Sequence, residues 1–217
     1  MHGRADLDLG ILAHELRNHL GVMQNALFLL RRRLSDMDAR VLRPVEILEN
    51  EVQAARALAE DLLVLAKGIT VHPEVGDVAA WVREAVLSLG EVPGVEVVWD
   101  TRSVRGRADR LWLARAVRNL VLNATEMLAR DGGRVEVSVE RDAQGVAIRV
   151  ADSGRGLPAA EADRVFEAFY TRKSGGTGLG LTLVRLVAEA HGGCVRAENR
   201  PEGGAVFTIR LPDGVEP

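Results

Sequence analysis

A histidine beside a carboxylate lies near the start of the chain, within residues 14–18. His14 is two residues from both Leu12 and Leu16, so at about 100° per residue it points away from the apolar face of a helix. A solvated imidazole can act as a nucleophile when one ring nitrogen is free and an acceptor such as Glu15 holds the other. An ordinary surface histidine is the alternative interpretation.

Two asparagines, Asn119 and Asn123, are four residues apart in a predicted long helix and therefore share one helix face. Asparagine is a mediocre helix former, so two of them in mid-helix indicate a role for their amide groups. An amide oxygen is a hard ligand that suits Mg²⁺. Hydrogen bonds from these amides to neighbouring loops are the alternative.

Two glycine-rich segments follow. In residues 152–156, after a predicted strand, Asp152 can accept a hydrogen bond from an exocyclic amine, and the glycines let backbone approach a flat ligand; a plain Asx-type turn is the alternative. Residues 175–181 open a predicted helix, whose N–H groups and positive dipole end can bind phosphate. Arg172 and Lys173 stand just upstream, placed to meet phosphate charge. The spacing is neither the dinucleotide fingerprint nor a Walker loop.

An amphipathic helical hairpin is predicted for residues 1–69. Apolar residues recur every three or four positions, as on one helix face, at Leu9, Leu12, Leu16, Leu20, Met23, Leu27, Leu30 and Leu34, and after a polar break at Val41, Val45, Leu48, Val52, Ala55, Leu62 and Leu65. Pro44 is expected in the first turn of the second helix, and Gly68 ends it. Two helices cannot bury both stripes well, so we expect a dimeric four-helix bundle. A hairpin packed on its own second domain is the alternative.

The remaining chain is predicted as a linker, residues 70–76, and a mixed domain, residues 77–217. Helices are expected near residues 77–89, 109–129, 160–166 and 179–190, and strands near 95–99, 135–140, 146–151, 194–198 and 205–211. Asp77 and Asp109 are expected to cap the first two of these helices. Helices mixed with antiparallel hairpins indicate an α+β sandwich, with the helices on one face of a sheet.

Composition narrows the class of protein. The chain has 217 residues, of which 47% are hydrophobic and 27% charged, so it can build globular cores. A net charge of −3 without a basic cluster argues against nucleic acid as a partner. The single cysteine, Cys194, cannot form an internal disulfide and suits a reducing compartment. No secretory signal or apolar run of membrane-spanning length is found, so we expect a chain that is not inserted in a membrane.

The order and spacing of these segments resemble the catalytic core of sensor histidine kinases along nearly the whole chain. The matching segments are the phosphoacceptor box at 14–18, the N box at 119–123, the glycine boxes at 152–156 and 176–181, and the F box at 166–170. Agreement of five boxes in order is not expected by chance. Residues 119–133 and the brief segment before Gly176 are most similar to the nitrogen-regulatory kinase subgroup.

The resemblance implies an N-terminal antiparallel hairpin forming a dimeric four-helix bundle, followed by an α/β sandwich ATP-binding domain of the Bergerat (GHKL) type. It also implies a cytoplasmic kinase, or the cytoplasmic part of a larger sensor protein, that phosphorylates its own His14 from Mg-ATP and passes the phosphoryl group to an aspartate of a response regulator receiver domain. The ATP-binding domain must then swing to the bundle on the linker.

The resemblance assigns residue roles as well. Glu15 would hold the imidazole and accept its proton, and Asn18 would orient water for phosphatase action on the partner. Asn123 would bind Mg²⁺, and Asp152 would select adenine through its amino group. The remaining nucleotide contacts implied are Asn119, Gly154, Gly156, Arg172, Lys173, Thr177, Gly178, Leu179 and Gly180.

Three positions depart from the family pattern. His19 stands where family members usually have proline, so the expected helix kink is in question. Glu126 and Met127 stand where many members carry a lysine and a tyrosine. These two changes leave open which cation contacts the triphosphate. They make Lys173 and Arg172 the main candidates for that contact.

Two other classes of protein compete with the kinase. An ATP-driven clamp of the same ATPase superfamily would carry a glutamate, as general base for water, where this chain has Asn119. A non-catalytic phosphotransfer or scaffold protein would keep the helical bundle but typically lose the glycine boxes, which are intact here. ATP binding separates these two rivals, and an acid-labile phosphoramidate on His14 separates the kinase from the clamp.

Overall fold

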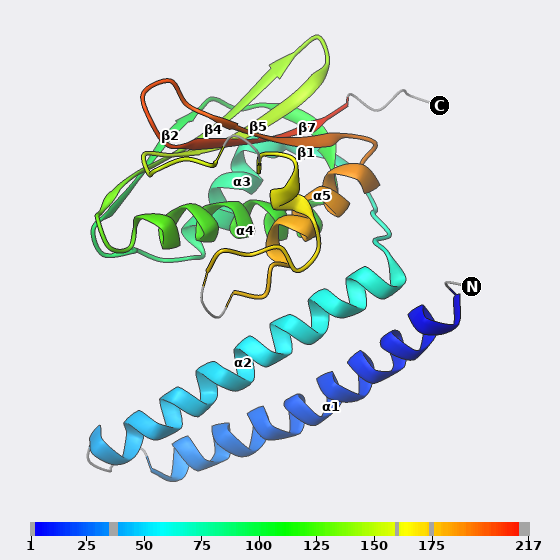
Figure 1. Ribbon diagram of the computed structural model, residues 1–217, viewed down its shortest axis with the longest axis vertical. Coiled ribbons are helices and arrows are strands. Elements are labelled where there is room, and N and C mark those ends of the chain that lie inside the picture. The colour runs from blue at the N-terminus through cyan, green and yellow to red at the C-terminus, as the bar shows by residue number, and fades with distance from the viewer. Residues whose placement is uncertain (1–2, 35–38, 159–160, 174–175, 213–217) are drawn as a thin grey trace. The chain divides into compact units, whose positions relative to one another are not determined.

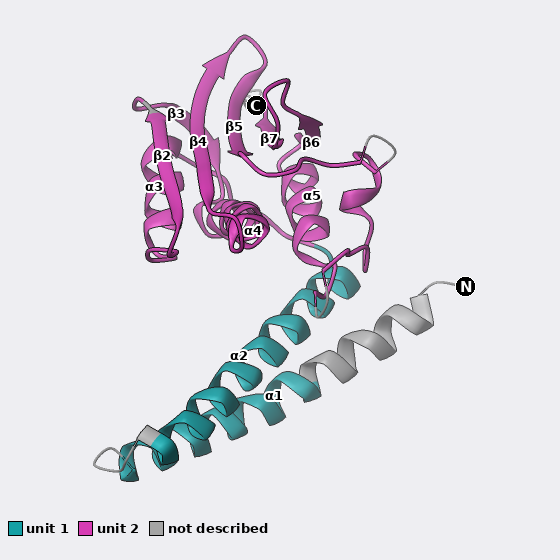
Figure 2. Cartoon of the chain, turned by 60° about the vertical axis from the view of Figure 1, so that its left-hand side comes forward, with its two compact units in different colours: residues 1–68 teal, residues 69–217 magenta. Residues whose placement is uncertain are grey.

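The computed structural model describes residues 3–34, 39–158, 161–173 and 176–212, with the side chains of 3–14, 39 and 101 left out (Figure 1). The chain divides into two compact units, Met1–Gly68 and Ile69–Pro217 (Figure 2). Each unit is built around its own set of elements. No helix of the described residues is long and apolar enough to cross a membrane.

Unit 1 is a pair of long helices, α1 (Gly3–Arg33) and α2 (Ala39–Lys67). The helices run antiparallel, because Gln24 donates to Gln53 at 3.0 Å while Arg31, further along α1, pairs with Glu49, which lies earlier on α2. Pro44 lies in the second turn of α2, not in the first turn as expected, so its ring removes one intrahelical hydrogen bond.

The helical stripes of unit 1 are only partly covered within this chain. Leu20 and Val45 are buried. Many other large apolar side chains remain exposed, namely Leu16, Val22, Met23, Phe28, Leu29, Leu30, Val41, Ile47 and Leu48. Several belong to the predicted stripes, so a single hairpin leaves apolar surface in contact with water.

Unit 2 contains a five-stranded mixed sheet. Its strands are β2 (Val95–Thr101), β4 (Gly133–Asp142), β5 (Gly145–Asp152), β7 (Ala205–Leu211) and β6 (Cys194–Asn199), in that order across the sheet. The first pair is parallel and the other pairs are antiparallel. Strand β7 alternates buried and half-buried side chains, as expected when one sheet face packs on helices, whereas the central strand β5 is buried along nearly its whole length.

Three helices, α3 (Val78–Leu87), α4 (Arg110–Leu128) and α5 (Gly180–Ala190), lie on one face of this sheet (Figures 1 and 2). Fully buried side chains fill the layer between helices and sheet, among them Leu113, Leu120, Ile148, Leu183 and Ile209. This two-layer packing confirms the predicted α+β class, with the helices segregated to one face of the sheet.

A second, two-stranded sheet corrects the expected linker. Strand β1 (Glu74–Asp77) pairs antiparallel with β3 (Arg105–Ala108), so the last three of residues 70–76 lie in a strand. The His72 N–H donates to Asp109 at 2.8 Å, and the Trp112 indole donates to the Thr70 carbonyl at 3.2 Å. Residues 70–76 are therefore tied to unit 2, through partners that lie some thirty to forty positions away in sequence.

The segment before the second glycine-rich stretch also differs from the sequence prediction. The helix expected near residues 160–166 is a single 3₁₀ turn, Arg164–Phe166. Within it Phe166 is buried and meets Phe207 of β7 edge to face, with ring centroids 6.2 Å apart. The turn is thus held by tertiary contact and not by helix length.

Candidate functional site

Helix α4 is fixed at its N-terminus by Asp109. One carboxylate oxygen accepts from the N–H groups of Leu111 and Trp112, at 3.0 and 3.2 Å, as predicted for a cap, and the other accepts from His72. Burial raises the pKa of Asp109, but the N–H donors of His72, Trp112 and Leu111 outweigh it, so the pKa lies below its ordinary value. This capping sets the position from which α4 presents its two asparagines.

Asn119 and Asn123 face the start of α5 and the segment before it. The Asn119 amide donates to the Gly180 carbonyl at 3.3 Å, which ties α4 to the first turn of α5. The Asn123 amide oxygen accepts from the Lys173 ammonium at 2.5 Å. Hydrogen bonding to neighbouring segments, the alternative reading for this pair, is therefore present. The partner of the Asn123 amide oxygen is a positively charged group, as a bound metal ion would also be.

Asp152 ends β5 with a buried carboxylate. Its Oδ1 oxygen accepts from the N–H groups of Gly154 at 2.8 Å and Ala205 at 3.4 Å. The Asx-type turn considered above is thus real, but it uses only one oxygen. Within the described part of the chain no donor to the Oδ2 oxygen is found, so that oxygen is available to a ligand amine.

Glycines bring backbone close around this aspartate. A Cβ at Gly204 would lie 1.9 Å from the Asp152 carbonyl oxygen. Gly156 has φ +72°, and a Cβ there would lie 2.6 Å from the side-chain oxygen of Asn199. Only glycine fits at either position. Asn199 and Gly204 were not among the sequence candidates, although the Gly203-Gly204 pair before β7 is a signal that could have drawn attention to them.

The second glycine-rich stretch leads into α5, and its described part starts at Gly176. Gly178 has φ +69°, and a Cβ there would lie 2.5 Å from the carbonyl carbon of Phe169. Leu179 is buried, and its N–H donates to the Thr177 hydroxyl at 3.3 Å. Helix α5 then begins at Gly180 without a side-chain cap. Uncapped N–H groups at a helix start are suited to bind an anion.

The two basic residues before this stretch have separate partners. Lys173 reaches α4, where its ammonium lies 2.5 Å from the Asn123 amide oxygen and 2.6 Å from a Glu126 carboxylate oxygen. Arg172 instead pairs with Glu161 at 3.6 Å. The same Glu161 accepts a hydrogen bond that raises the pKa of the Tyr170 hydroxyl. Lys173 is therefore the cation of this pair that lies beside Asn123.

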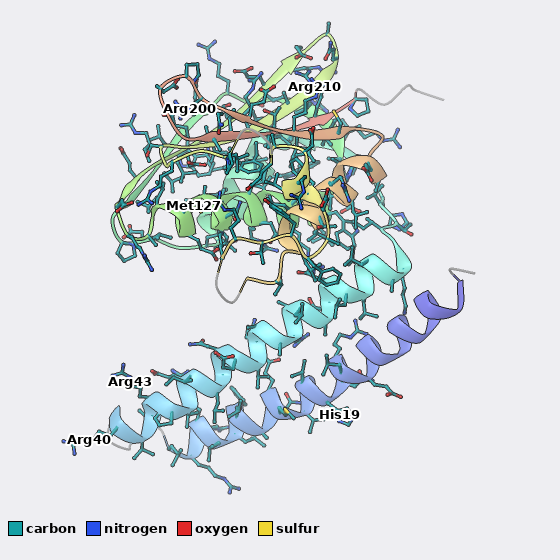
Figure 3. All side chains as sticks on the ribbon, viewed as in Figure 1. His19, Arg40, Arg43, Met127, Arg200 and Arg210 are labelled. Carbon is teal, nitrogen blue, oxygen red and sulfur yellow. The ribbon has the colours of Figure 1, made fainter. Side chains whose placement is uncertain are left out.

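The phosphoacceptor candidates belong to unit 1. His14 lies in α1, but its side chain is outside the described residues. Glu15 and Asn18 are exposed on the same helix. His19 also projects from α1 into solvent (Figure 3). The histidine segment and the nucleotide candidates are thus carried by different units of the chain.

Comparisons with known proteins show which protein family has this fold. Residues 108–215 match the family model of the histidine kinase-, DNA gyrase B- and HSP90-like ATPases. The chain is 32% identical over 218 residues to the sensor protein kinase PilS of Pseudomonas aeruginosa, covering 95% of this chain and 40% of that protein. It is 28% identical to sporulation kinase A of Bacillus subtilis over 209 residues, covering 93% of this chain and 33% of that protein.

Solved structures of histidine kinases are also similar to this chain. The catalytic domain of the histidine kinase ThkA matches with a TM-score of 0.60 and 29% identity, over 66% of this chain and 97% of that one. Full-length ShkA, a complex with AMPPNP, shares the fold over 96% of this chain and 46% of its own, with a TM-score of 0.75 and 24% identity.

The mixed sheet with three helices on one face, and the asparagine, aspartate and glycine positions around α4 and α5, define an ATPase domain of this kind. The chain belongs to the sensor histidine kinases and comprises their catalytic core. It spans about two-fifths of the length of PilS and a third of sporulation kinase A. Its placement in the nitrogen-regulatory subgroup stays a prediction.

Proposed function

We propose that this chain uses Mg-ATP to phosphorylate His14 and then passes the phosphoryl group to an aspartate of a response regulator receiver domain. The observation that carries the proposal is the meeting of distant motifs at α4 of an ATPase fold. Asn119 contacts Gly180 at the second glycine box, and Asn123 contacts Lys173 just before it. These residues are separated by fifty positions or more in sequence.

Unit 2 carries groups suited to each part of Mg-ATP. The buried Asp152 carboxylate has an oxygen available for the amino group of adenine, and glycines leave room for a flat ring nearby. The uncapped start of α5 and Lys173 supply N–H groups and positive charge for phosphates. Asn123 would hold Mg²⁺, because its amide oxygen already contacts a cation. Bound Mg²⁺ would neutralise phosphate charge during transfer.

The transfer step falls to His14 in unit 1. A ring nitrogen of His14 would attack the γ-phosphorus, forming an N–P bond while the bond to the ADP oxygen breaks and ADP leaves with its electron pair. The proton on the other ring nitrogen would pass to Glu15, which leaves the imidazole ring neutral and the negative charge on the attached phosphoryl group. Residues 1–69 would thus act as the dimerisation and phosphotransfer hairpin, and residues 77–217 as the ATP-binding domain.

Two further features support the assembly proposed. The exposed apolar side chains of unit 1 are suited to a second hairpin, giving a dimeric four-helix bundle. One structural neighbour is the histidine kinase ThkA in complex with the response regulator protein TrrA, with a TM-score of 0.68 and 25% identity. A receiver domain is accordingly the partner we propose for this chain.

The test is labelling from ATP. Full chain incubated with Mg²⁺ and γ-labelled ATP should become labelled, and the label should be lost in acid and retained in base. His14→Gln should eliminate labelling, while the matched variant His19→Pro should retain it, since His19 has no adjacent carboxylate. Label that persists in the His14→Gln protein and maps to His19 would show that the nucleophile is wrongly assigned.

A further inference from the structure

A lysine ammonium lies where a metal ion would be expected. Lys173 is one of only two lysines in the chain, the other being Lys67. Its ammonium is 2.5 Å from the Asn123 amide oxygen and 2.6 Å from a Glu126 carboxylate oxygen. Asn123 and Glu126 are three residues apart on α4, so they share a helix face and converge on one point.

The oxygens that meet there are of the kind that Mg²⁺ prefers. An amide oxygen and a carboxylate oxygen are both hard ligands, and the carboxylate adds a full negative charge. The lysine side chain is 31% exposed and the glutamate side chain 59% exposed, so water and ions can reach the pair. Two cations cannot share these two oxygens at close range, because their charges repel.

We propose that Asn123 and Glu126 form a two-oxygen cation site, which Lys173 fills in the nucleotide-free chain and which Mg²⁺ takes over when ATP binds. This inference rests on the proposed function for the ATP site. Glu126 is then a specificity-determining residue, since its carboxylate strengthens metal binding. The exchange also releases Lys173, whose ammonium becomes available to the phosphates, whereas Arg172 stays paired with Glu161.

Metal binding without nucleotide tests the competition. Mn²⁺, used as the probe for Mg²⁺, is titrated into the full chain while free Mn²⁺ is measured by electron paramagnetic resonance. Lys173→Met should bind Mn²⁺ about three- to fivefold more tightly than the unchanged chain, the range expected when a partly exposed ion pair is removed. The matched variant Lys67→Met should bind as the unchanged chain does.

Adding Glu126→Gln to Lys173→Met should reverse the gain, because the carboxylate is then missing. Equal Mn²⁺ affinity in Lys173→Met and the unchanged chain would overturn the proposal. So would a double variant that binds Mn²⁺ as tightly as Lys173→Met alone. Circular dichroism on each variant shows whether the fold survives, and Glu126→Lys gives a second variant in which Mn²⁺ binding should be weakest.

Lysine side-chain NMR tests the exchange itself. With labelled lysine the chain gives two side-chain signals, so Lys67 is an internal control. Mg-AMPPNP should shift the Lys173 signal and leave the Lys67 signal in place. Calorimetry on the same sample separates two failures. If AMPPNP does not bind, the proposed function fails; if AMPPNP binds and the Lys173 signal does not move, the cation exchange fails.

Discussion

At the scale of single residues, Asp152 illustrates how one side chain serves structure and ligand at once. Its Oδ1 oxygen holds the turn after β5 through Gly154 and Ala205, and Oδ2 has no donor within the described residues. A carboxylate buried in this way depends on its donors, since burial alone disfavours the charge. One carboxylate oxygen therefore serves the turn, and the other is available to the nucleotide.

Asp152→Asn should keep much of the turn, because an amide oxygen can accept from the same N–H groups, yet weaken ATP binding. Asp152→Ala should weaken binding at least as strongly, by tenfold or more, roughly the worth of a hydrogen bond to a charged group. Calorimetric titration with AMPPNP measures both. An unchanged dissociation constant in the asparagine variant, with the fold intact by circular dichroism, would remove the Asp152 charge from the nucleotide site.

Asn18 offers a second expectation at this scale. It lies one helical turn from His14 on α1 and is exposed. We expect Asn18→Ala to spare labelling of His14 but to slow dephosphorylation of the phosphorylated receiver domain, because its amide would orient the attacking water. Both rates are followed with labelled receiver protein. A parallel fall in both activities would mean that Asn18 has a structural or shared role.

At the scale of elements, helix α4 is held at its first turn by contacts from three parts of unit 2. Asp109 accepts from its own helix and from His72, and its N–H donates to the ring nitrogen Nε2 of His191 at 2.9 Å. His191, which caps the C-terminus of α5, has its other ring nitrogen 2.7 Å from the Val187 carbonyl. This pattern requires a neutral ring with its hydrogen on Nδ1.

Asp109→Ala should therefore lower the free energy of unfolding by about 1–2 kcal/mol, the usual cost of losing such a cap. Because the folded-state pKa of Asp109 is depressed, its contribution is fully present above the ordinary value of 3.8 and is lost as pH falls through the folded-state pKa. Urea unfolding at pH 7 and near pH 3 measures the difference, which should shrink at the lower pH. Asp109→Asn, a neutral cap, is the control and should lose less stability at pH 7. An alanine variant as stable as the unchanged chain at pH 7 would contradict the capping role.

At the scale of the whole molecule, the chain joins two units of different character. Unit 2 buries most of its apolar residues between three helices and a sheet, whereas the hairpin of unit 1 leaves many of its large apolar side chains exposed. Phe28 and Ile47 are both more than half exposed. Patches of this kind are usually buried by association.

We expect the full chain to be a dimer, and Phe28→Glu combined with Ile47→Glu to shift it to monomer, because burying two carboxylates in an apolar interface is costly. Sedimentation at tens of micromolar, roughly the range where such dimers persist, measures the mass. The matched variant Leu87→Glu changes an exposed apolar residue of unit 2 and should remain dimeric. A monomeric unchanged chain would rule out the four-helix bundle.

Local patterns in the sequence were sufficient for much of the fold. The periodic apolar stripes predicted α1 and α2, and Asp77 and Asp109 were predicted as caps, where they accept from Ala80 and from Leu111 and Trp112. Helix periodicity and capping are read within a few residues, so no distant contact is needed to find them. The spacing of Asn119 and Asn123 on one helix face was likewise determined by α-helical geometry alone.

Only the tertiary structure decided which distant groups meet. Strand β1 was taken for a linker because a four-residue strand has no periodic signal of its own and exists through pairing with β3. The sequence indicated Arg172 and Lys173 as the candidate cations for phosphate binding. The packing of the chain gives them different partners, since Arg172 pairs with Glu161 and Lys173 contacts Asn123 and Glu126. A side chain's partner across fifty residues depends on how the intervening elements pack, and no local pattern carries that information.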